Sequence, residues 1–550
     1  MREGFRQSMA WLHTWAGLLV CWVLFLVFCA GTSSYFKDEI SLWMKPELHR
    51  RGPVTVSDTQ ATQQAIGYLQ RHAAGAPRWF ISLPDERRPV VSVLWTLPPK
   101  QAAGGEGGKR RRFETRLLDP ATGEVLADAR ETRGGEFLYR LHFDLHYMPA
   151  IWARWIVSFC AMFMLVAIVS GIVTHRRIFK DFFTFRRNKG QRSWLDAHNA
   201  TAVLALPFHL MITYTGLVTL LFMLMPWGVH SAYQGDHQTF AAELQRRPPR
   251  VTASGEAAPL VPLAPLLEEA RRHWDGAPVQ RLAIEQPGDA SATITLTRDK
   301  GRSMSADAPS LLFEGATGKR LAAFGEAPGP SDHTRGVMVG LHVAQFAEPA
   351  LRWLFFLCGL AGCAMVATGA LLWAVKTRQK QARAIAAGAR PSPGLWLVEA
   401  LNIGAIAGLP IAFASYFWAN RLLPVGMPLR TELEIRAFFI AWAVAALLAL
   451  MRPSRGMWTV QLGLAATLFC SLPLLNWATG GAHLGVTLSG AGPLAVGGFD
   501  LVVLALGAGL GYAGWRLCRQ RACAAPGGTR TARSRAGASA SPAHAAEPTA

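Results

Sequence analysis

The sequence predicts an α-helical integral membrane protein with about eight spans and two α+β domains outside the membrane. Three observations predict this class. Of the 550 residues, 51% are hydrophobic, and the apolar residues fall into runs long enough to cross a hydrocarbon core. Two long polar segments separate the first four runs. The first pair of runs, with its polar segment, recurs in the second pair, so we expect a duplicated four-helix core.

The expected spans are the apolar runs of about 20 residues. They lie at 8–30, 151–174, 197–225, 351–375, 395–418, 435–451, 457–477 and 494–517. The first run resembles a signal peptide, but it is long and contains His13, so we expect a retained span. The expected division is span one at 1–30, an outer domain at 31–150, span two at 151–174, a basic loop at 175–196, span three at 197–225, an outer domain at 226–350, span four at 351–375, a loop at 376–394, four accessory spans at 395–517 and a disordered tail at 518–550.

The net charge is +20, and the loops in which the Lys and Arg residues lie indicate the membrane topology and not a nucleic-acid partner. Residues 175–194 contain seven Lys or Arg and one acid, and residues 376–395 contain five Lys or Arg and no acid. Short basic loops face the cytoplasm. We therefore expect cytoplasmic N- and C-termini, with the two long polar segments on the other side of the membrane. All eight cysteines lie in spans or in the tail, so no disulfide framework is expected in the outer domains.

The duplication places histidines at equivalent positions. His13 opens span one and His198 opens span three, and each precedes a glycine, Gly31 or Gly216, by 18 residues. A strand, a glycine turn and a second strand are expected at both 118–126 and 313–321. The repeats then end on Leu-His pairs before spans two and four. We expect the four spans to pack around a pseudo-two-fold axis along the membrane normal.

Helix geometry suggests a column of imidazoles through this core. His13 and His198 lie at equal depth and can face one another. His142 and His342 are equivalent at the outer mouth, and His146 follows His142 by one turn of the same helix face. His209 follows His198 by about three helical turns, which would place it about 16 Å nearer the exterior. Histidines in outer loops, such as His49, are expected to be solvated.

An ionisable side chain inside a bilayer indicates function, because it is costly there. Paired neutral imidazoles on facing helices are the axial ligands of a membrane cytochrome. We predict two haems held by His13, His198, His142, His146, His209 and His342, with the pairing at the outer mouth left open. The haem is expected to be b-type, because no Cys-x-x-Cys-His is present. His142 and His146 could instead hold zinc or ferric iron.

Several separated motifs resemble the PepSY-associated transmembrane family. They are the residues 11–18, the paired Ala-Thr-Gly turns, residues 206–216, and Gly340-Leu341-His342 followed by Arg352-Trp353. The resemblance covers about residues 1–380. It implies PepSY-like periplasmic domains, a bacterial inner-membrane location and a link to iron uptake, where some members are siderophore reductases with two b-type haems. Residues 395–517 depart from the four-span pattern and contain no intramembrane histidine.

Three function hypotheses follow. The favoured one is an oxidoreductase that passes electrons outward through two haems to a ferric siderophore and releases Fe(II). No Rossmann fingerprint is present, so the electrons must come from a quinol of the surrounding lipid or from a cytoplasmic reductase. The alternatives are a siderophore permease that uses histidines as proton relays, and a non-enzymatic module whose PepSY-like domains bind a partner.

Overall fold

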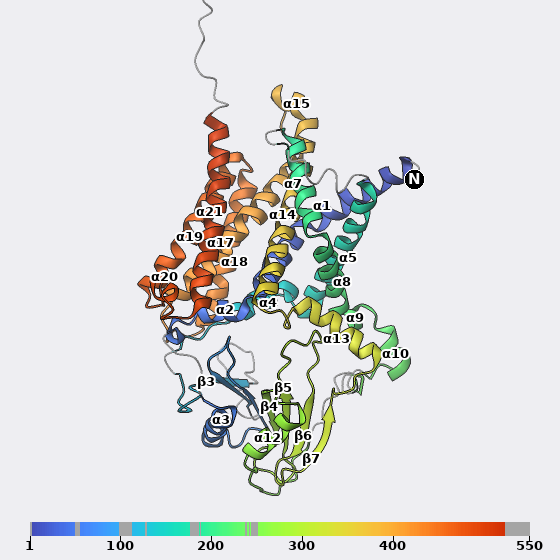
Figure 1. The fold of residues 1–550 in the computed structure, drawn as a ribbon. Helices are drawn as coiled ribbons and strands as arrows, with labels where there is room; N and C mark the ends of the chain where they lie inside the picture. Colours follow the sequence, from blue (N-terminus) through green and yellow to red (C-terminus); the bar gives the residue numbers. More distant parts are fainter. Residues whose placement is uncertain are drawn as a thin grey trace, which may run out of the picture.

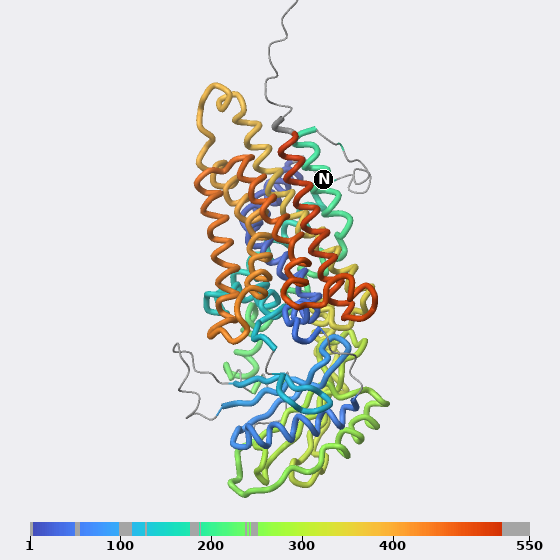
Figure 2. Tube along the Cα trace, turned by 90° about the vertical axis from the view of Figure 1, so that its left-hand side faces the viewer, coloured from blue at the N-terminus to red at the C-terminus, as the bar shows by residue number. Residues whose placement is uncertain are grey.

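The protein consists of a bundle of long helices with a β-sheet domain at one end (Figures 1 and 2). The computed structural model describes residues 3–49, 56–97, 113–126, 129–175, 186, 189–236, 239–240, 243 and 251–522. In these residues, seven helices are long and apolar enough to cross a membrane, and a bent pair makes an eighth span if counted as one. The multi-pass class and the approximate number of spans are therefore confirmed.

The duplicated core contains the first four spans. Its helices are α1 (Glu3–Ser34), α4 (Gly134–Asp144), α5 (Ala150–Thr174), α7 (Gln191–Leu204), α8 (Leu206–Thr219), α13 (Pro330–Val343) and α14 (Pro349–Lys380). In sequence order, α4 and α5 of the first repeat correspond to α13 and α14 of the second. Both α4 and α13 end at a residue with left-handed backbone, Leu145 or Ala344, before the next span begins.

The third span is broken, which corrects the prediction of one straight helix at 197–225. Helices α7 and α8 meet at Ala205 and are bent by 68°. Pro207 lies in the first turn of α8, where a missing backbone N–H is tolerated, so the sequence favours a helix start at this point. Because of the bend, counting turns from His198 does not give the height of His209. Two short helices, α9 (Leu221–Leu224) and α10 (Trp227–Tyr233), follow.

The two polar segments form a single sheet and not two separate domains. The strands are β1 (Arg78–Ser82), β2 (Val91–Thr96), β3 (Phe113–Leu118), β4 (Val279–Glu285), β5 (Thr293–Arg298), β6 (Ser310–Glu314) and β7 (Arg320–Phe324). Their order is β3-β2-β1-β4-β5-β6-β7, and β1 pairs antiparallel with β4. Each half alone would expose an unpaired edge at this position, so joining them satisfies both edges.

Helices α3 (Asp58–His72) and α12 (Ala264–His273) supply the apolar side chains that cover the sheet. Leu69 of α3 and Leu266 of α12 share one core with Ile81 and Leu282 of the two central strands. The predicted glycine turns are present in both halves. Gly123 and Gly318 have positive φ angles of 72° and 76°, and the backbone N–H of each donates to the carbonyl four residues earlier.

The helices of residues 393–522 form an accessory bundle beside the core (Figure 1). Its first span is continuous and consists of α16 (Pro393–Asn402), the π-helix η2 (Ile403–Ala407) and α17 (Gly408–Leu422). The other three spans are α18 (Arg430–Met451), α19 (Arg455–Ala478) and α21 (Leu494–Ala522). The bundle also contains the short helix α20 (Leu484–Leu488), and three short helices lie outside it: α2 (Lys37–Trp43), η1 (Pro46–Leu48) and α15 (Ala382–Ala386). The predicted tail begins inside α21, and its part beyond Ala522 lies outside the described residues.

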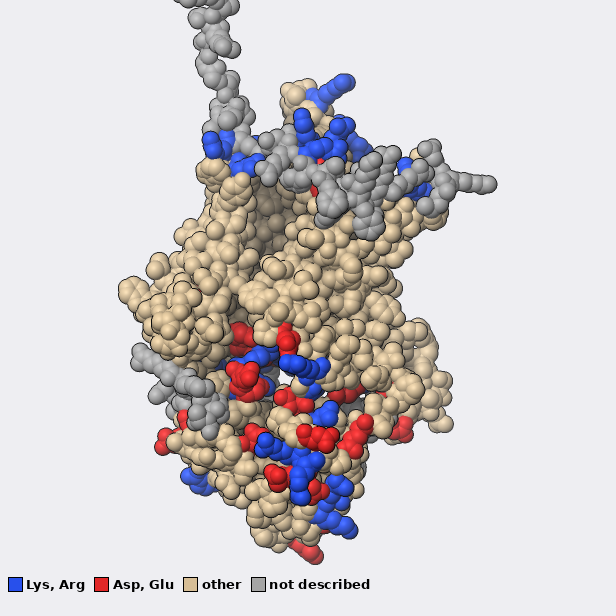
Figure 3. All heavy atoms as spheres, in the orientation of Figure 1, with Lys and Arg blue, Asp and Glu red and all other residues tan. Residues whose placement is uncertain are grey.

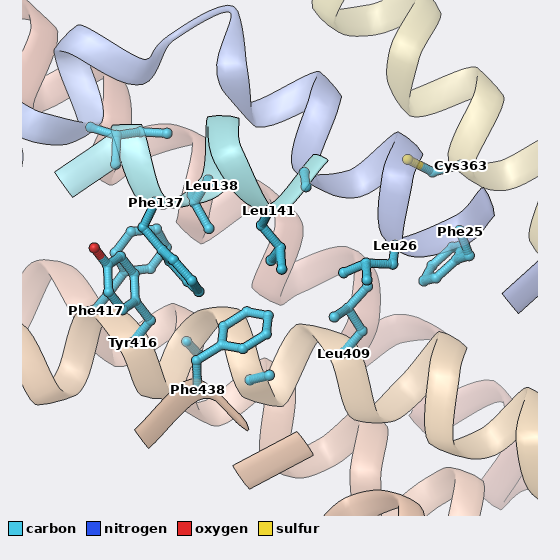
Figure 4. Packing of buried hydrophobic residues seen from close by; sticks show 14 of the residues in the cluster. Phe25, Leu26, Phe137, Leu138, Leu141, Cys363, Leu409, Tyr416, Phe417 and Phe438 are labelled. Carbon is cyan, nitrogen blue, oxygen red and sulfur yellow. The ribbon is translucent and has the colours of Figure 1, made fainter. Parts of the chain in front are cut away.

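The accessory bundle and the core share one continuous apolar interior. Leu26 of α1, Leu141 of α4, Leu409 of α17 and Phe438 of α18 belong to the same buried cluster (Figure 4). Lys and Arg side chains gather at the end of the helices away from the sheet, whereas both charge signs mix over the sheet and its junction with the bundle (Figure 3). We call these two ends of the molecule the basic end and the sheet end.

Candidate metal centres

Four of the predicted histidines form two pairs. His13 of α1 and His198 of α7 make the basic-end pair, with ring centroids 6.1 Å apart. His142 of α4 and His342 of α13 make the sheet-end pair, with centroids 6.0 Å apart. Two imidazoles bound in line to one metal ion, at bonds of about 2.0 Å, place their ring centres about 6 Å apart. Both pairs therefore have the separation at which two imidazoles would hold one metal ion between them.

The basic-end pair is oriented by backbone carbonyls of neighbouring spans. Nδ1 of His13 lies 2.8 Å from the carbonyl oxygen of Ala167, and Nδ1 of His198 lies 2.9 Å from that of Met365. A carbonyl oxygen only accepts, so each Nδ1 carries the proton and donates it. The lone pair of each ring is therefore on Nε2, which is the nitrogen left to bind a metal ion.

The sheet-end pair repeats this arrangement. Nδ1 of His142 donates to the carbonyl oxygen of Val27 at 2.7 Å, and Nδ1 of His342 donates to that of Ile212 at 3.1 Å. The hydroxyl oxygen of Thr215 lies 3.2 Å from the same nitrogen of His342. All four histidines thus have the same protonated nitrogen, although they come from four different helices.

A glycine lies against each of the four imidazoles, four residues after the carbonyl that binds it. The glycines are Gly171 for His13, Gly369 for His198, Gly31 for His142 and Gly216 for His342. A Cβ at Gly31 would lie 2.7 Å from both Cε1 and Nδ1 of His142, and at the other three the nearest ring atom would lie 3.0–3.1 Å away. Each glycine therefore allows an imidazole to approach the backbone of a helix.

The 18-residue spacing of the sequence has a structural explanation. Gly31, 18 residues after His13 in α1, contacts His142 of the other pair. One helix therefore carries a ligand of the basic-end pair and the docking position of the sheet-end pair. At 1.5 Å per residue these two positions are about 27 Å apart, which is close to the thickness of a hydrocarbon core.

Both sheet-end imidazoles are neutral at pH 7. Burial lowers the pKa of His142, and it lowers the pKa of His342 to about 3, with the neighbouring His142 as a second cause. Neutral imidazole is the form that binds a metal ion, so burial keeps both rings in the ligating state.

A cavity adjoins each pair. The cavity at the basic-end pair has a volume of about 420 Å³ and is lined mainly by apolar side chains, including Leu18, Met164 and Trp373. The cavity at the sheet-end pair is much larger, about 2090 Å³, and lies between the helix ends and the sheet. Charged side chains of both signs line its sheet side, including Arg298 and Asp307. The first cavity suits a flat apolar ligand, and the second suits a large polar one.

His146 lies beyond the end of α4, which corrects the prediction that it follows His142 on the same helix face. The prediction assumed that α4 continues past His142, but α4 ends at Asp144. Leu145, His146 and Tyr147 all have positive φ angles, so the chain turns away from the helix axis. The imidazole of His146 stacks on Phe439 of the accessory bundle, with centroids 5.6 Å apart.

His209 is buried near the basic-end pair but does not form a third pair. It lines the smaller cavity, its ring lies edge-on to Phe28, and its Nε2 lies 3.4 Å from the carbonyl oxygen of Cys358. Its Nδ1 has no hydrogen-bond partner among the described residues.

Two further histidines have definite partners. The expectation of a solvated His49 is wrong, because its side chain is buried. Its Nε2 donates to the carbonyl oxygen of Leu42, and its Nδ1 accepts from the backbone N–H of Ala482 in the accessory bundle. His175 accepts from the Asn199 side chain at the rim of the smaller cavity.

The described part of the chain contains no cluster of three or more His, Cys, Asp or Glu side chains that could hold a bare metal ion. The zinc alternative assumed that His142 and His146 lie on one helix face, whereas α4 ends at Asp144 and the His146 imidazole stacks on Phe439. A pair of imidazoles fits a metal ion whose other ligands are supplied by a macrocycle. The residues present therefore fit haem better than an isolated ion.

Fold and site together define a multi-pass membrane protein with a duplicated four-helix core and two histidine pairs. The family model described as "PepSY-associated TM region" matches residues 10–376, so the chain belongs to this family. An uncharacterized protein from Pseudomonas aeruginosa is 29% identical over 389 residues, which cover 67% of this chain and 92% of that relative. The matched region contains all six predicted histidines, whereas the accessory bundle lies after it.

Proposed function

We propose that the protein is a di-haem b-type oxidoreductase of the bacterial inner membrane, which reduces a ferric siderophore in the periplasm. The observation that carries the proposal is the pair of matched histidine sites, with ring centroids 6.1 and 6.0 Å apart and every Nδ1 held by a backbone carbonyl. When bound, haem supplies a one-electron couple at each site. His13 and His198 would hold one haem, and His142 and His342 the other.

The chain's own residues supply position and environment. The two sites are about 27 Å apart along α1, so together they would carry an electron most of the way across a bilayer. The glycines and carbonyls orient the four rings, and mainly apolar side chains line the smaller cavity.

The larger cavity supports the substrate assignment, because this chamber of about 2090 Å³ is lined both by His142 and His342 and by charged side chains of the sheet. Arg352 and Arg87 share the carboxylate of Glu39 beside this chamber, so part of its charged lining is already ordered. One electron converts Fe(III) to Fe(II), whose lower charge weakens binding to hard oxygen ligands, so the iron is released.

The basic end supports an orientation with cytoplasmic termini and a periplasmic sheet domain (Figure 3). The electron donor would then be a membrane quinol or a cytoplasmic reductase that reaches the basic-end pair. Lipid surrounds the bundle, whose outer surface exposes large apolar side chains such as Ile440 and Leu447.

The test is anaerobic mixing of the dithionite-reduced protein in nanodiscs with a ferric hydroxamate and a ferrous-specific dye. We expect the reduced haem spectrum to decay as the dye develops colour. The His142→Ala variant should slow this oxidation while the basic-end site is still reduced by dithionite.

The permease alternative predicts another outcome, in which the reduced spectrum persists with every chelate and labelled siderophore crosses sealed vesicles. A partner-binding module would show neither haem nor transport. Either outcome would replace the reductase proposal.

A further inference from the structure

The accessory bundle makes hydrogen bonds at the N-terminal end of α4, the helix that carries His142. The Tyr416 hydroxyl of α17 donates to the carbonyl oxygen of Gly134 at 3.0 Å. Gly134 begins α4 with a φ angle of 51°, and its N–H donates to the hydroxyl of Thr132. That hydroxyl in turn donates to the Glu434 carboxylate of α18 at 2.5 Å.

The Glu434 side chain that accepts from Thr132 is itself fixed by buried contacts. It is fully buried, accepts from the Asn420 amide at 2.9 Å and forms an ion pair with Arg430. Arg430 also donates to the backbone carbonyl of Glu131 at 2.9 Å. A buried charge pair with several satisfied hydrogen bonds has few alternative arrangements, so the segment before α4 is fixed to α17 and α18.

Aromatic packing holds the same helix along its length. The Phe137 ring of α4 lies 4.9 Å from the Tyr416 ring and 5.4 Å from the Phe438 ring, centroid to centroid (Figure 4). Phe137 and His142 are five residues apart, which places them about 140° apart around the helix. The face of α4 that contacts the accessory bundle is therefore nearly opposite the face that carries the histidine.

The C-terminal end of α4 is fixed as well. Phe439 stacks on His146, and the Tyr147 hydroxyl donates to Glu432 at 2.9 Å. Both contacted residues belong to the positive-φ segment that ends α4. Non-glycine residues in this conformation are strained and persist only where surrounding contacts determine them.

The equivalent helix α13 is held differently. The backbone N–H of Ala306, in the loop after β5, donates to the carbonyl oxygen of Gly336 at 2.9 Å, and Arg335 pairs with Asp307. A Cβ at Gly340 would collide with the Met304 carbonyl, so this loop packs directly on the α13 backbone. The sheet domain thus holds His342, whereas the accessory bundle holds the helix of His142.

We propose that the accessory bundle is a positioning device for the sheet-end site. Tyr416, Glu434 and Phe439 are its positioning residues, which fix α4 and thereby the orientation of the His142 imidazole. This assigns a role to spans outside the family match, and it rests on the proposed haem function.

The test compares Tyr416→Phe and Phe439→Leu with Trp418→Phe. The control removes one hydrogen bond from the Trp418 indole to the Leu468 carbonyl, on the same helix α17 but within the accessory bundle. Each substitution is made in a His13→Ala background, which retains the sheet-end site, and in a His142→Ala background, which retains the basic-end site. The readouts are the electron paramagnetic resonance of low-spin ferric haem and the rate of haem loss to apomyoglobin.

We expect Tyr416→Phe and Phe439→Leu to broaden the low-spin signal and to speed haem loss about two- to tenfold in the His13→Ala background, the effect of one lost buried contact. The same substitutions should leave the His142→Ala background unchanged, and Trp418→Phe should leave both unchanged. Equal effects in the two backgrounds, or from the control, would mean that the bundle only adds general stability.

A second measurement keeps this inference separate from the haem proposal. Hydrogen exchange of the α4 backbone amides in Tyr416→Phe should be faster than in wild type, with the α13 amides unchanged. If α4 exchange is unchanged, the positioning role is wrong whether or not haem binds. If neither background binds haem, the proposed function fails instead.

Discussion

Gly31→Ala is the most demanding test of the histidine sites. The added Cβ would lie 2.7 Å from Cε1 and Nδ1 of His142, the shortest contact among the four glycines that face the paired imidazoles. To restore an ordinary contact of 3.4 Å, the imidazole of His142 must move by about 0.7 Å, and this movement also stretches its hydrogen bond to the Val27 carbonyl. Overpacking costs about 1–3 kcal/mol, so haem affinity at the sheet-end site should fall roughly 5- to 150-fold.

Haem content per chain and the rate of haem transfer to apomyoglobin provide the assay. Gly31→Ala should lose haem from one site only, and Gly171→Ala and Gly369→Ala should have milder effects at the basic-end site. Gly463→Ala is the matched control, because a Cβ there has no neighbour within 4 Å. Full haem content with wild-type release kinetics in Gly31→Ala would refute the docking of His142 on α1.

Three other predictions follow from the same structure. His13→Ala and His198→Ala should remove the same haem, and identical difference spectra would show it; two distinct losses would separate the pair. His142→Ala should halve the haem content, whereas His146→Ala should keep both haems and only speed haem loss from the sheet-end site, because it removes the same stacking contact as Phe439→Leu. Burial lowers the folded-state pKa of His49 from 6.5 to about 4, so its contribution to stability is present above pH 6.5 and is lost as the pH falls toward 4. Lowering the pH from 7 to 5 should cost about 2 kcal/mol, visible in thermal melts and reduced in His49→Gln.

The sequence was sufficient to predict the pair His13–His198 and the equivalence of His142 and His342, because equivalent positions of a duplicated unit have equivalent depths. It left the pairing at the outer mouth open, and the structure brings His142 and His342 together there. The sequence also identified Gly31 and Gly216 by their spacing, although their contact with imidazoles could not be foreseen. In α1 the 18-residue interval measures the distance along one helix between two different sites, whereas in the second repeat it crosses the bend between α7 and α8. Only tertiary packing shows which histidine each glycine meets.

Other features depend on interactions that sequence periodicity does not encode. The joining of two polar segments into one sheet depends on the pairing of β1 with β4, which are about 200 residues apart. His146 was misplaced because the left-handed residue that ends α4 is Leu145 and not a glycine. The span prediction of 197–225 did not use Pro207, although a proline is favoured in the first turn of a helix and so indicates a helix start at this point.

The central claim is that each histidine pair holds one haem. The visible absorption spectrum of the purified protein, with haem extracted and counted against protein concentration, tests it most directly. We expect a Soret band that shifts on reduction by dithionite, and about two non-covalently bound haems per chain. A protein purified from haem-replete cells that shows no Soret band, or retains haem only covalently, would contradict the account.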